Sequence, residues 1–206
     1  MLEARQASFS RVYASTRLQL GNAELIPGTQ LLVNEQAALH GVSATPVREA
    51  FAKLAGERLI EDRERLGYFV PLLSSVELIS LTELLELYLM QAISHGRRRD
   101  RTDPNCGARE MRDEAAALMA IFACSDNPLL GEEAQRCLDR SAFARRRQIE
   151  LYGPPATLGS IAEALALRDW SEVSRHVRLH CRTSRARAGE VAHSMAATYR
   201  ETIARK

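Results

Sequence analysis

The chain has 206 residues, of which 46% are hydrophobic and 26% charged, a balance that predicts a packed globular protein and excludes global disorder. Lys and Arg number 28 against 26 Asp and Glu, so the net charge of +2 excludes a polybasic chain and gives no support for nucleic-acid binding. Aromatic residues make up only 5%, which, in a sequence rich in Leu, Ala, Arg and Glu, favours a mostly helical fold.

Short elements separated by turn signals are predicted over the first third of the chain. Apolar residues at helical spacing predict a helix over residues 9–20, and residues 31–33 are suited to a short strand. Asn34 is a suitable N-cap for the helix that follows, because its side chain can accept a hydrogen bond from a free backbone N–H. Gly41 is expected to end that helix, since glycine readily adopts the left-handed backbone required there.

A second short helix follows after only a few residues, and the two together form the helix-turn-helix pattern. Thr45 is expected to cap this helix, with Pro46 in the first helical position, where its missing N–H has no partner to lose. Residues 59–60 and 67–70 are predicted to be two strands, and the polar segment 61–66 between them a β-wing.

The pattern of predicted secondary structure changes near residues 71–75, where long helices replace the short elements. We therefore expect two domains, covering residues 1–73 and 74–206. A bundle of five or six helices is expected in the second, with its last stretch either continuous or kinked near Gly189. The predicted helices cover residues 75–95, 103–124, 127–152, 158–167 and 170–200.

Neither a membrane segment nor a cysteine-based site is expected. The most apolar run, residues 78–93, is interrupted by polar residues and is too short to span a membrane. The four cysteines are spaced unlike a zinc knuckle or a CxxC motif, so we expect them to be ordinary core residues. The sequence opens without an apolar signal core. These features favour a protein of the reducing cytoplasm.

The helix-turn-helix segment contains a long motif, Gly41-Val42-Ser43 followed, after one residue, by Thr45-Pro46-Val47-Arg48-Glu49-Ala50. With this motif as the longest matching run, the first 73 residues resemble the signature of the GntR family of bacterial transcription regulators. The resemblance implies a winged helix-turn-helix, so the fold class expected is mainly α, with this domain followed by an all-α bundle. The other matching residues are Ile26-Pro27-Gly28, Leu31, Leu39, Leu54, Leu59-Ile60 and Gly67-Tyr68-Phe69-Val70.

The second part carries Asn127-Pro128-Leu129, Ala164-Leu165, Asp169 and His180 in that order. On these residues it resembles the FCD effector domain of the FadR-like subfamily, in its shorter VanR-like variant. The resemblance implies a homodimer paired through the helical domains, with a small carboxylate often bound inside each of them.

DNA contacts are expected from the start of the second short helix and from the wing, as the resemblance to GntR regulators implies. Arg48 is the leading candidate, because a guanidinium can donate two hydrogen bonds to guanine; the alternative is a solvated arginine paired with a glutamate. Thr45 either contacts the DNA or only caps its helix. The full set expected at the DNA is Asn34, Ser43, Ala44, Thr45, Pro46, Arg48, Arg63, Arg65 and Gly67.

Two of these positions depart from the pattern of many GntR relatives. Ala44 stands where an arginine is common, and Asn34 where a charged residue is common. An arginine contact to a base is typically worth about 1–3 kcal/mol, so its loss is expected to change the preferred operator. A dimer would still require double-stranded DNA with two-fold related half-sites.

FCD domains usually hold a divalent metal with one acidic residue and three histidines. On this resemblance, Glu114 takes the acidic place and His180 one histidine place, whereas Leu118 and Leu158 replace the other two histidines. One carboxylate and one imidazole make a poor metal site. We therefore expect this degenerate site to be empty, with no metal and no other cofactor.

The interior of the helical domain is expected to be unusually apolar. Tyr88 and Ala92 occupy positions where relatives often carry an arginine and a glutamate facing the ligand. Either the small-molecule effector is more hydrophobic than a citrate-like acid, or the cavity has closed and the domain serves only in dimerisation. The residues expected around a ligand are Tyr88, Glu114, Leu118, Leu158 and His180.

The sequence carries no nucleophile elbow, P-loop, His-Glu-x-x-His or paired-carboxylate motif, so an enzyme is not expected. The expected function is that of a DNA-binding transcription regulator whose affinity for its operator is controlled by a small molecule. Repression is the usual mode of action in the family it resembles. The alternative is a helical module that uses its winged helix for protein contacts, which a sequence-specific gel shift would distinguish.

Overall fold

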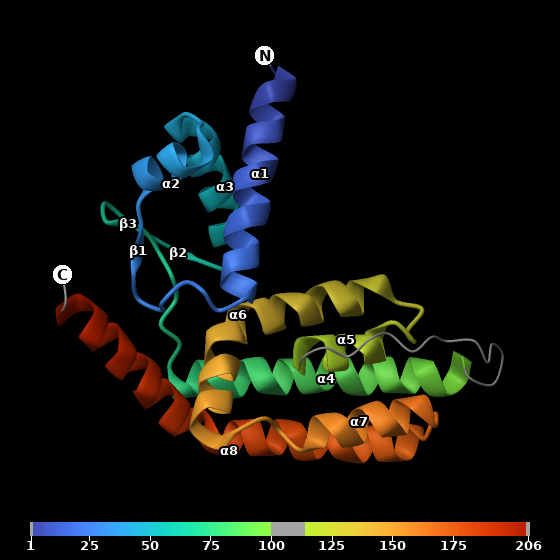
Figure 1. Cartoon of the computed structure of the whole chain (residues 1–206). Coiled ribbons are helices and arrows are strands. Elements are labelled where there is room, and N and C mark those ends of the chain that lie inside the picture. Colours follow the sequence, from blue (N-terminus) through green and yellow to red (C-terminus); the bar gives the residue numbers. More distant parts are fainter. Residues whose placement is uncertain (1, 100–113, 205–206) are drawn as a thin grey trace. The chain divides into compact units, whose positions relative to one another are not determined.

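The computed structural model describes residues 2–99 and 114–204, which divide into two compact units. The first unit holds the described residues up to Leu73, the segment Asp139–Arg147 and the residues from Ala192 onward, and the second unit holds the others. The described chain is mainly helical, with one small sheet in the first unit (Figure 1). The predicted fold class, a winged helix-turn-helix followed by helices, is confirmed.

The first unit is built around the inner face of its third helix. Val47, Ala50, Phe51 and Leu54 recur on that face at helical spacing and have no exposed surface. Val12 of the first helix is equally buried in the same cluster, so the two helices pack face to face. The helices of this unit are α1 (Leu2–Gly21), α2 (Val33–His40) and α3 (Ala44–Gly56).

The start of α2 differs from the prediction, whereas its end agrees with it. The helix begins at Val33, and the residue before it, Leu32, makes no side-chain capping bond. Asn34 therefore lies inside the first turn, and its predicted role as N-cap is wrong. Gly41 ends the helix with φ of 61° and ψ of 41°, the left-handed conformation that the sequence predicts there.

The start of α3 is also earlier than the sequence predicts, by two residues. Ser43 is the N-cap residue and makes no side-chain capping bond, and the helix begins at Ala44. Thr45 is therefore not the cap, and Pro46 is not the first helical residue, so both predictions are wrong. Pro46 is tolerated because the N–H groups of the first turn have no acceptor within the helix.

Three short antiparallel strands, in the order β1–β3–β2, form the wing sheet. Arg63 pairs with Gly67, so residues 64–66 make the turn of the wing. Residues 59–60 are buried in the core before the second strand begins, and their prediction as a strand is wrong. The strands are β1 (Gln30–Leu31), β2 (Glu61–Arg63) and β3 (Gly67–Phe69).

The helices of the second part follow the predicted pattern closely. Asn127 caps α6 by accepting a hydrogen bond from the backbone N–H of Leu129 at 3.1 Å. α8 runs unbroken through Gly189, in agreement with the one-helix alternative. Of the helix predicted over residues 103–124, positions 103–113 lie outside the described residues. The helices are α4 (Ser75–Arg99), α5 (Glu114–Phe122), α6 (Pro128–Tyr152), α7 (Thr157–Ala166) and α8 (Trp170–Ala204).

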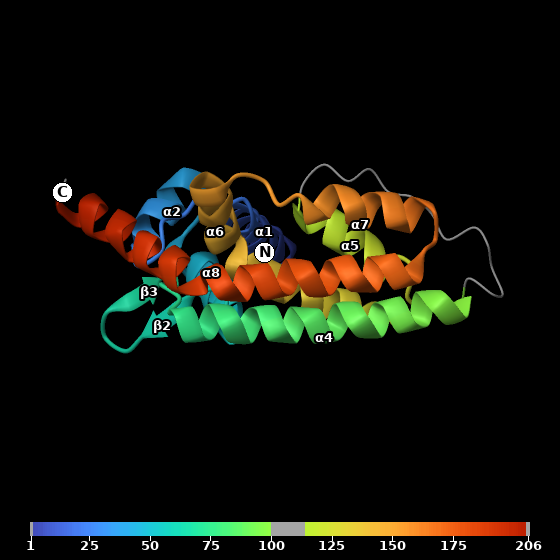
Figure 2. The same ribbon diagram turned by 90° about the horizontal axis from the view of Figure 1, so that it is seen from below.

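The core of the second unit lies between the inner faces of α4, α5, α7 and α8. Leu89, Leu118, Ile161 and Val173, one from each of these helices, have no exposed surface. α5 contacts both α4 and α7, and α4 and α8 run side by side (Figure 2). Within residues 2–99 and 114–204, none of the helices combines the length and the apolar character needed to cross a membrane.

Gly96 on α4 allows the indole ring of Trp170, at the start of α8, to pack directly on the helix backbone. A Cβ atom added at Gly96 would lie only 2.4 Å from an indole carbon. Trp170 is itself buried, so its ring cannot simply turn into solvent. The absence of a side chain at this position therefore fixes how closely the two helices approach.

We expect Gly96→Ala to lower the free energy of unfolding by about 1–3 kcal/mol, because the added methyl group overpacks the contact with Trp170. Urea unfolding followed by circular dichroism measures the change. Gly189→Ala is the matched control, since a Cβ there meets nothing within 4 Å. The control should gain about 0.4–1 kcal/mol. Equal losses in the two variants would show that the indole contact is not the cause.

Candidate nucleic-acid interface and the buried pair of the helical unit

The N-terminal end of α3 presents a short polar surface to solvent. Ser43, Thr45 and Arg48 are exposed, and the last two lie three residues apart on one face of the helix. Ala44 is half-buried and Pro46 is buried, so Pro46 contributes to the core rather than to the surface. The opposite face of the same helix is the buried one, and this packing holds the exposed residues in place.

Arg48 has no carboxylate partner among the residues that the structure describes. Its neighbour Glu49, the obvious candidate, is instead bound by Arg5 of α1. Arg48 lies close enough to Tyr68 for its charge to lower the pKa of that phenol, although burial and Asp62 raise the pKa more. The guanidinium is therefore available to a ligand, and the alternative of a glutamate-paired Arg48 is not what the structure contains.

The wing places its two arginines in different situations. The side chain of Arg65, in the turn of the wing, is 90% exposed, and Gly67 follows with φ of 93°. Arg63 donates to Glu61 at 2.7 Å, and its guanidinium lies 4.3 Å from the centre of the Phe69 ring. Arg65 can therefore extend away from the sheet, whereas Arg63 is held along it and largely neutralised.

The α2 side of the motif has one exposed candidate and one contact that sequence reasoning missed. Asn34 is exposed in the first turn of α2. Arg11 of α1 donates to the backbone carbonyl of His40 at 2.9 Å, which ties α1 to the end of α2. No sequence signal identifies this contact, because an arginine in an amphipathic helix is ordinarily a solvated residue.

The helical unit brings together the acidic residue and the histidine that the FCD resemblance singles out. Glu114 Oε1 of α5 and His180 Nε2 of α8 are 3.2 Å apart, and both side chains are 5% exposed. Thr157 Oγ1 of α7 lies 3.1 Å from the other ring nitrogen of His180. Both imidazole nitrogens therefore have polar neighbours, which is how a histidine is accommodated inside a core.

The remaining residues expected around a ligand are distributed differently. Leu118, one turn after Glu114 on α5, is completely buried, and Leu158, next to Thr157 on α7, is half-buried. Tyr88 lies instead near Glu133, Arg136 and Cys137 of α6, and burial is the main cause of its raised pKa. Across residues 2–99 and 114–204, no group of three or more His, Cys, Asp or Glu side chains is arranged to hold a metal ion.

Three of the cysteines are buried and free, as the sequence predicts. Burial raises the pKa of the Cys181 thiol to about 12, with smaller contributions of the same sign from Glu86 and Glu114. A thiol of this kind is protonated at neutral pH and chemically inert. Cys106 lies outside the described residues.

We expect His180→Ala to lower the free energy of unfolding by about 1–3 kcal/mol, because it removes a hydrogen-bonding partner from the buried carboxylate of Glu114. Chemical unfolding of the full chain measures the change. His193→Ala is the control, since His193 is an exposed histidine on the same helix and should change stability by less than about 0.5 kcal/mol. A loss no larger than that of the control would mean that the pair contributes nothing to folding.

Comparison with known proteins finds a likeness to bacterial regulators in the N-terminal part of the chain. The model of the "Bacterial regulatory proteins, gntR family" matches residues 9–70. A Streptomyces ambofaciens protein described as an HTH-type transcriptional regulator in an unstable DNA locus is 44% identical over 59 residues. That match covers 29% of this chain and 25% of the relative, so the chain spans about a quarter of the length of the curated relative it matches.

Solved structures resemble the chain over most of its length. A transcriptional regulator GntR from Rhodococcus sp. RHA1 has a TM-score of 0.68 at 16% identity, covering 88% of this chain and 97% of that one. E. coli McbR/YncC has a TM-score of 0.58 at 18% identity, covering 95% of this chain and 98% of that one. At such identities the likeness establishes the fold alone, including the helical second part that the family model does not reach.

Proposed function

Since residues 9–70 form a GntR-family winged helix-turn-helix domain, we propose that this chain is a transcription regulator that binds double-stranded DNA. The observation that carries the proposal is the exposed N-terminal end of α3. Thr45 and Arg48 are exposed there, Arg48 has no carboxylate partner among the described residues, and the opposite face of the helix is buried. In a helix-turn-helix, this end of the second helix enters the major groove. Arg65 of the wing would reach the adjacent backbone or minor groove.

We propose further that the regulator acts in the cytoplasm as a homodimer on two-fold related half-sites, most simply as a repressor. The support is the resemblance to FadR-like regulators, in which the helical FCD domains pair. The domain organisation expected is a DNA-binding domain over residues 1–73 and an effector and dimerisation domain over 74–206. A closed two-fold assembly binds a palindromic operator because each head reads one half-site.

The second proposed element is control by a small molecule without a resident metal. Glu114 and His180 would face the effector, while Leu118 and Leu158 supply apolar surface where an FCD domain usually carries histidines. The competing possibility is a closed helical domain that serves only in dimerisation. That possibility is favoured by His180, because both of its ring nitrogens already have polar neighbours in Glu114 and Thr157.

We expect Arg48→Ala to weaken operator binding by about 1–3 kcal/mol, roughly five- to 150-fold, and to relax specificity at one base pair in each half-site. Arg65→Ala should instead weaken binding to all sequences alike and reduce the salt dependence. The operator is first selected from random duplexes, and affinities are then measured by fluorescence anisotropy at several salt concentrations.

Arg58→Ala serves as the control for both variants, because Arg58 is an exposed arginine just beyond the opposite end of α3. It removes the same charge and should leave operator affinity nearly unchanged. Selection that returns no preferred sequence, with wild-type binding no tighter than to random DNA, would contradict the proposal and favour a winged helix used for protein contacts.

For ligand control, we expect an apolar monocarboxylate such as octanoate to raise the melting temperature and to weaken operator binding, with citrate doing neither. The physical reason is that leucines replace the polar groups that would bind further carboxylates. Thermal shift detects binding, and anisotropy at saturating octanoate detects release of DNA. A bound acid that leaves operator affinity unchanged would refute the control mechanism, and binding of neither acid would favour the closed domain.

A further inference from the structure

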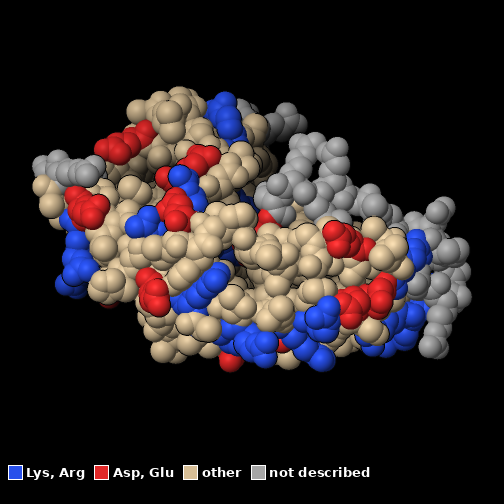
Figure 3. Space-filling view, turned by 60° about the horizontal axis from the view of Figure 1, so that its bottom comes forward, with Lys and Arg blue, Asp and Glu red and all other residues tan. Residues whose placement is uncertain are grey.

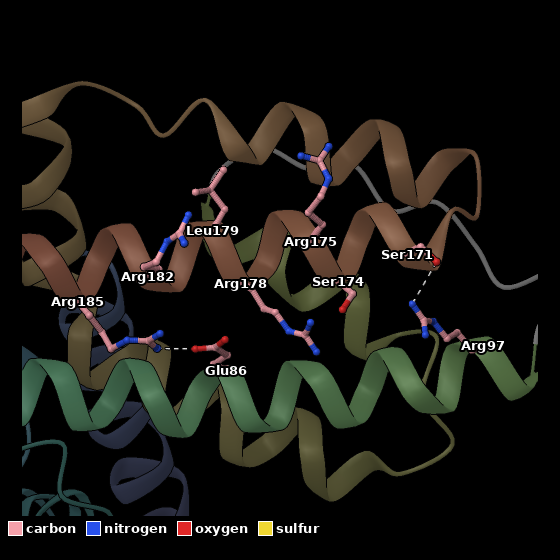
Figure 4. Close-up of a pocket in the computed structure, with 9 residues that line it drawn as sticks. All are labelled: Glu86, Arg97, Ser171, Ser174, Arg175, Arg178, Leu179, Arg182 and Arg185. Atoms are coloured by element: carbon pink, nitrogen blue, oxygen red, sulfur yellow. Dashed lines mark hydrogen bonds and ion pairs between the residues drawn. The ribbon is translucent and has the colours of Figure 1, made fainter.

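A groove between α4 and α8, wholly within the second unit, is lined mostly by arginine side chains. Its volume is about 700 Å³, within the range of small-molecule binding sites. Of the described residues that line it, Glu86 is the only acidic one. The arginines are Arg97, Arg175, Arg178, Arg182 and Arg185, and Figure 4 shows them around the groove.

Carboxylates neutralise two of these five arginines. Glu86 of α4 forms an ion pair with Arg185 of α8. Glu172, one turn before Arg175 on α8, binds that arginine, and the same contact is the main cause of the lowered pKa of Glu172. These two pairs hold their side chains in position at the ends of the arginine row.

The other three guanidinium groups have no carboxylate partner in the described part of the chain. Arg97 donates to the backbone carbonyl of Trp170 at 2.9 Å, which orients it but leaves its charge unbalanced. Arg178 and Arg182 make neither a hydrogen bond nor an ion pair with described residues, and both are exposed. The groove therefore carries an excess of positive charge, and an anion entering it would meet guanidinium donors that nothing else occupies.

The four arginines of α8 form a continuous row. They stand at intervals of three, four and three residues, which keeps them on one side of the helix. Ten residues of helix separate the first from the last, about 15 Å along the axis. In Figure 4 the side chain of Arg178 extends toward α4, while those of Arg175 and Arg182 extend away from it. Figure 3 shows Lys and Arg side chains gathered along the lower part of the molecular face.

We propose that this groove binds a small molecule bearing several linked phosphate groups, such as a polyphosphate or a nucleoside polyphosphate. A single small anion would meet only one or two of the arginines. Linked phosphates place several charges in line, and each offers oxygens that a planar guanidinium can bind in pairs. The site is separate from the α3 surface and from the Glu114–His180 pair.

The first experiment titrates the full chain with sodium tripolyphosphate, pyrophosphate and orthophosphate by calorimetry, at a constant ionic strength of about 0.15 M so that exposed charges are screened. Affinity should rise with the number of phosphates. A parallel titration with ATP distinguishes two sources of the same chemistry. Tighter binding of ATP than of tripolyphosphate indicates a nucleotide, and equal binding indicates the phosphate chain alone; both support the site.

The second experiment compares two double variants that remove equal charge. Arg178→Gln with Arg182→Gln should weaken tripolyphosphate binding at least about tenfold, because two charge-assisted contacts are lost. Arg98→Gln with Arg200→Gln removes two exposed arginines outside the groove and should change the affinity little. Light scattering is recorded for all proteins, so that oligomeric state and anion binding are measured separately.

Three results would overturn the proposal. Equal losses in the two double variants would mean diffuse charge attraction and no defined site. If the wild type binds no tripolyphosphate and the groove variant loses a dimer that the wild type forms, the groove is assigned to a second copy of the chain. Weaker DNA binding by that variant, again without tripolyphosphate binding by the wild type, would assign it to DNA. Because the titrations contain no DNA, their outcome does not depend on whether the chain binds an operator.

Discussion

Phe51 has no exposed surface, and its ring meets the ring of Tyr68 edge to face with their centres 5.2 Å apart. This contact joins the buried face of α3 to β3 of the wing. An aromatic pair in this geometry contributes about 0.5–1.5 kcal/mol beyond the burial of its surface. Because a helix is rigid over a few turns, fixing the inner face of α3 also fixes the direction of Thr45 and Arg48 on its outer face. The geometry of the candidate DNA surface therefore depends on a hydrophobic contact that no DNA would touch.

The ion pairs around α3 leave Arg48 without a carboxylate partner among the described residues. Arg5 binds Glu49, Glu61 binds Arg63, and Tyr13 donates to Glu57 at 2.8 Å. Surface ion pairs of this kind contribute little to stability, typically less than about 1 kcal/mol. Their consequence here is local. Because Arg5 already binds Glu49, the neighbour of Arg48 on α3, the guanidinium of Arg48 keeps its donors free for a ligand.

The two units treat buried polarity in opposite ways. The core of the first unit is apolar except for Thr16, whereas the second buries Glu114 and His180 against each other. A buried charged or polar pair is costly to desolvate and is weak evidence for stability. The pair lies beside Leu118, which is completely buried one turn further along α5, so its polar groups have apolar surroundings. The arginine groove differs from this pair, because most of its guanidinium groups are exposed and an anion could reach them without the burial of a charge.

The sequence alone determined the order of the helices, the left-handed end of α2 at Gly41, the capping of α6 by Asn127, and the buried inner face of α3. These follow from local rules, because periodicity, capping and glycine conformation depend on near neighbours. Tertiary structure decided the helix starts at Val33 and Ala44, because packing outweighs a capping preference of about 1 kcal/mol. It also decided that β2 begins at Glu61, through its register with β3, and that Arg185 of α8 is paired with Glu86 of α4. The Glu86–Arg185 pair joins residues far apart in the chain, so no local pattern can reveal it.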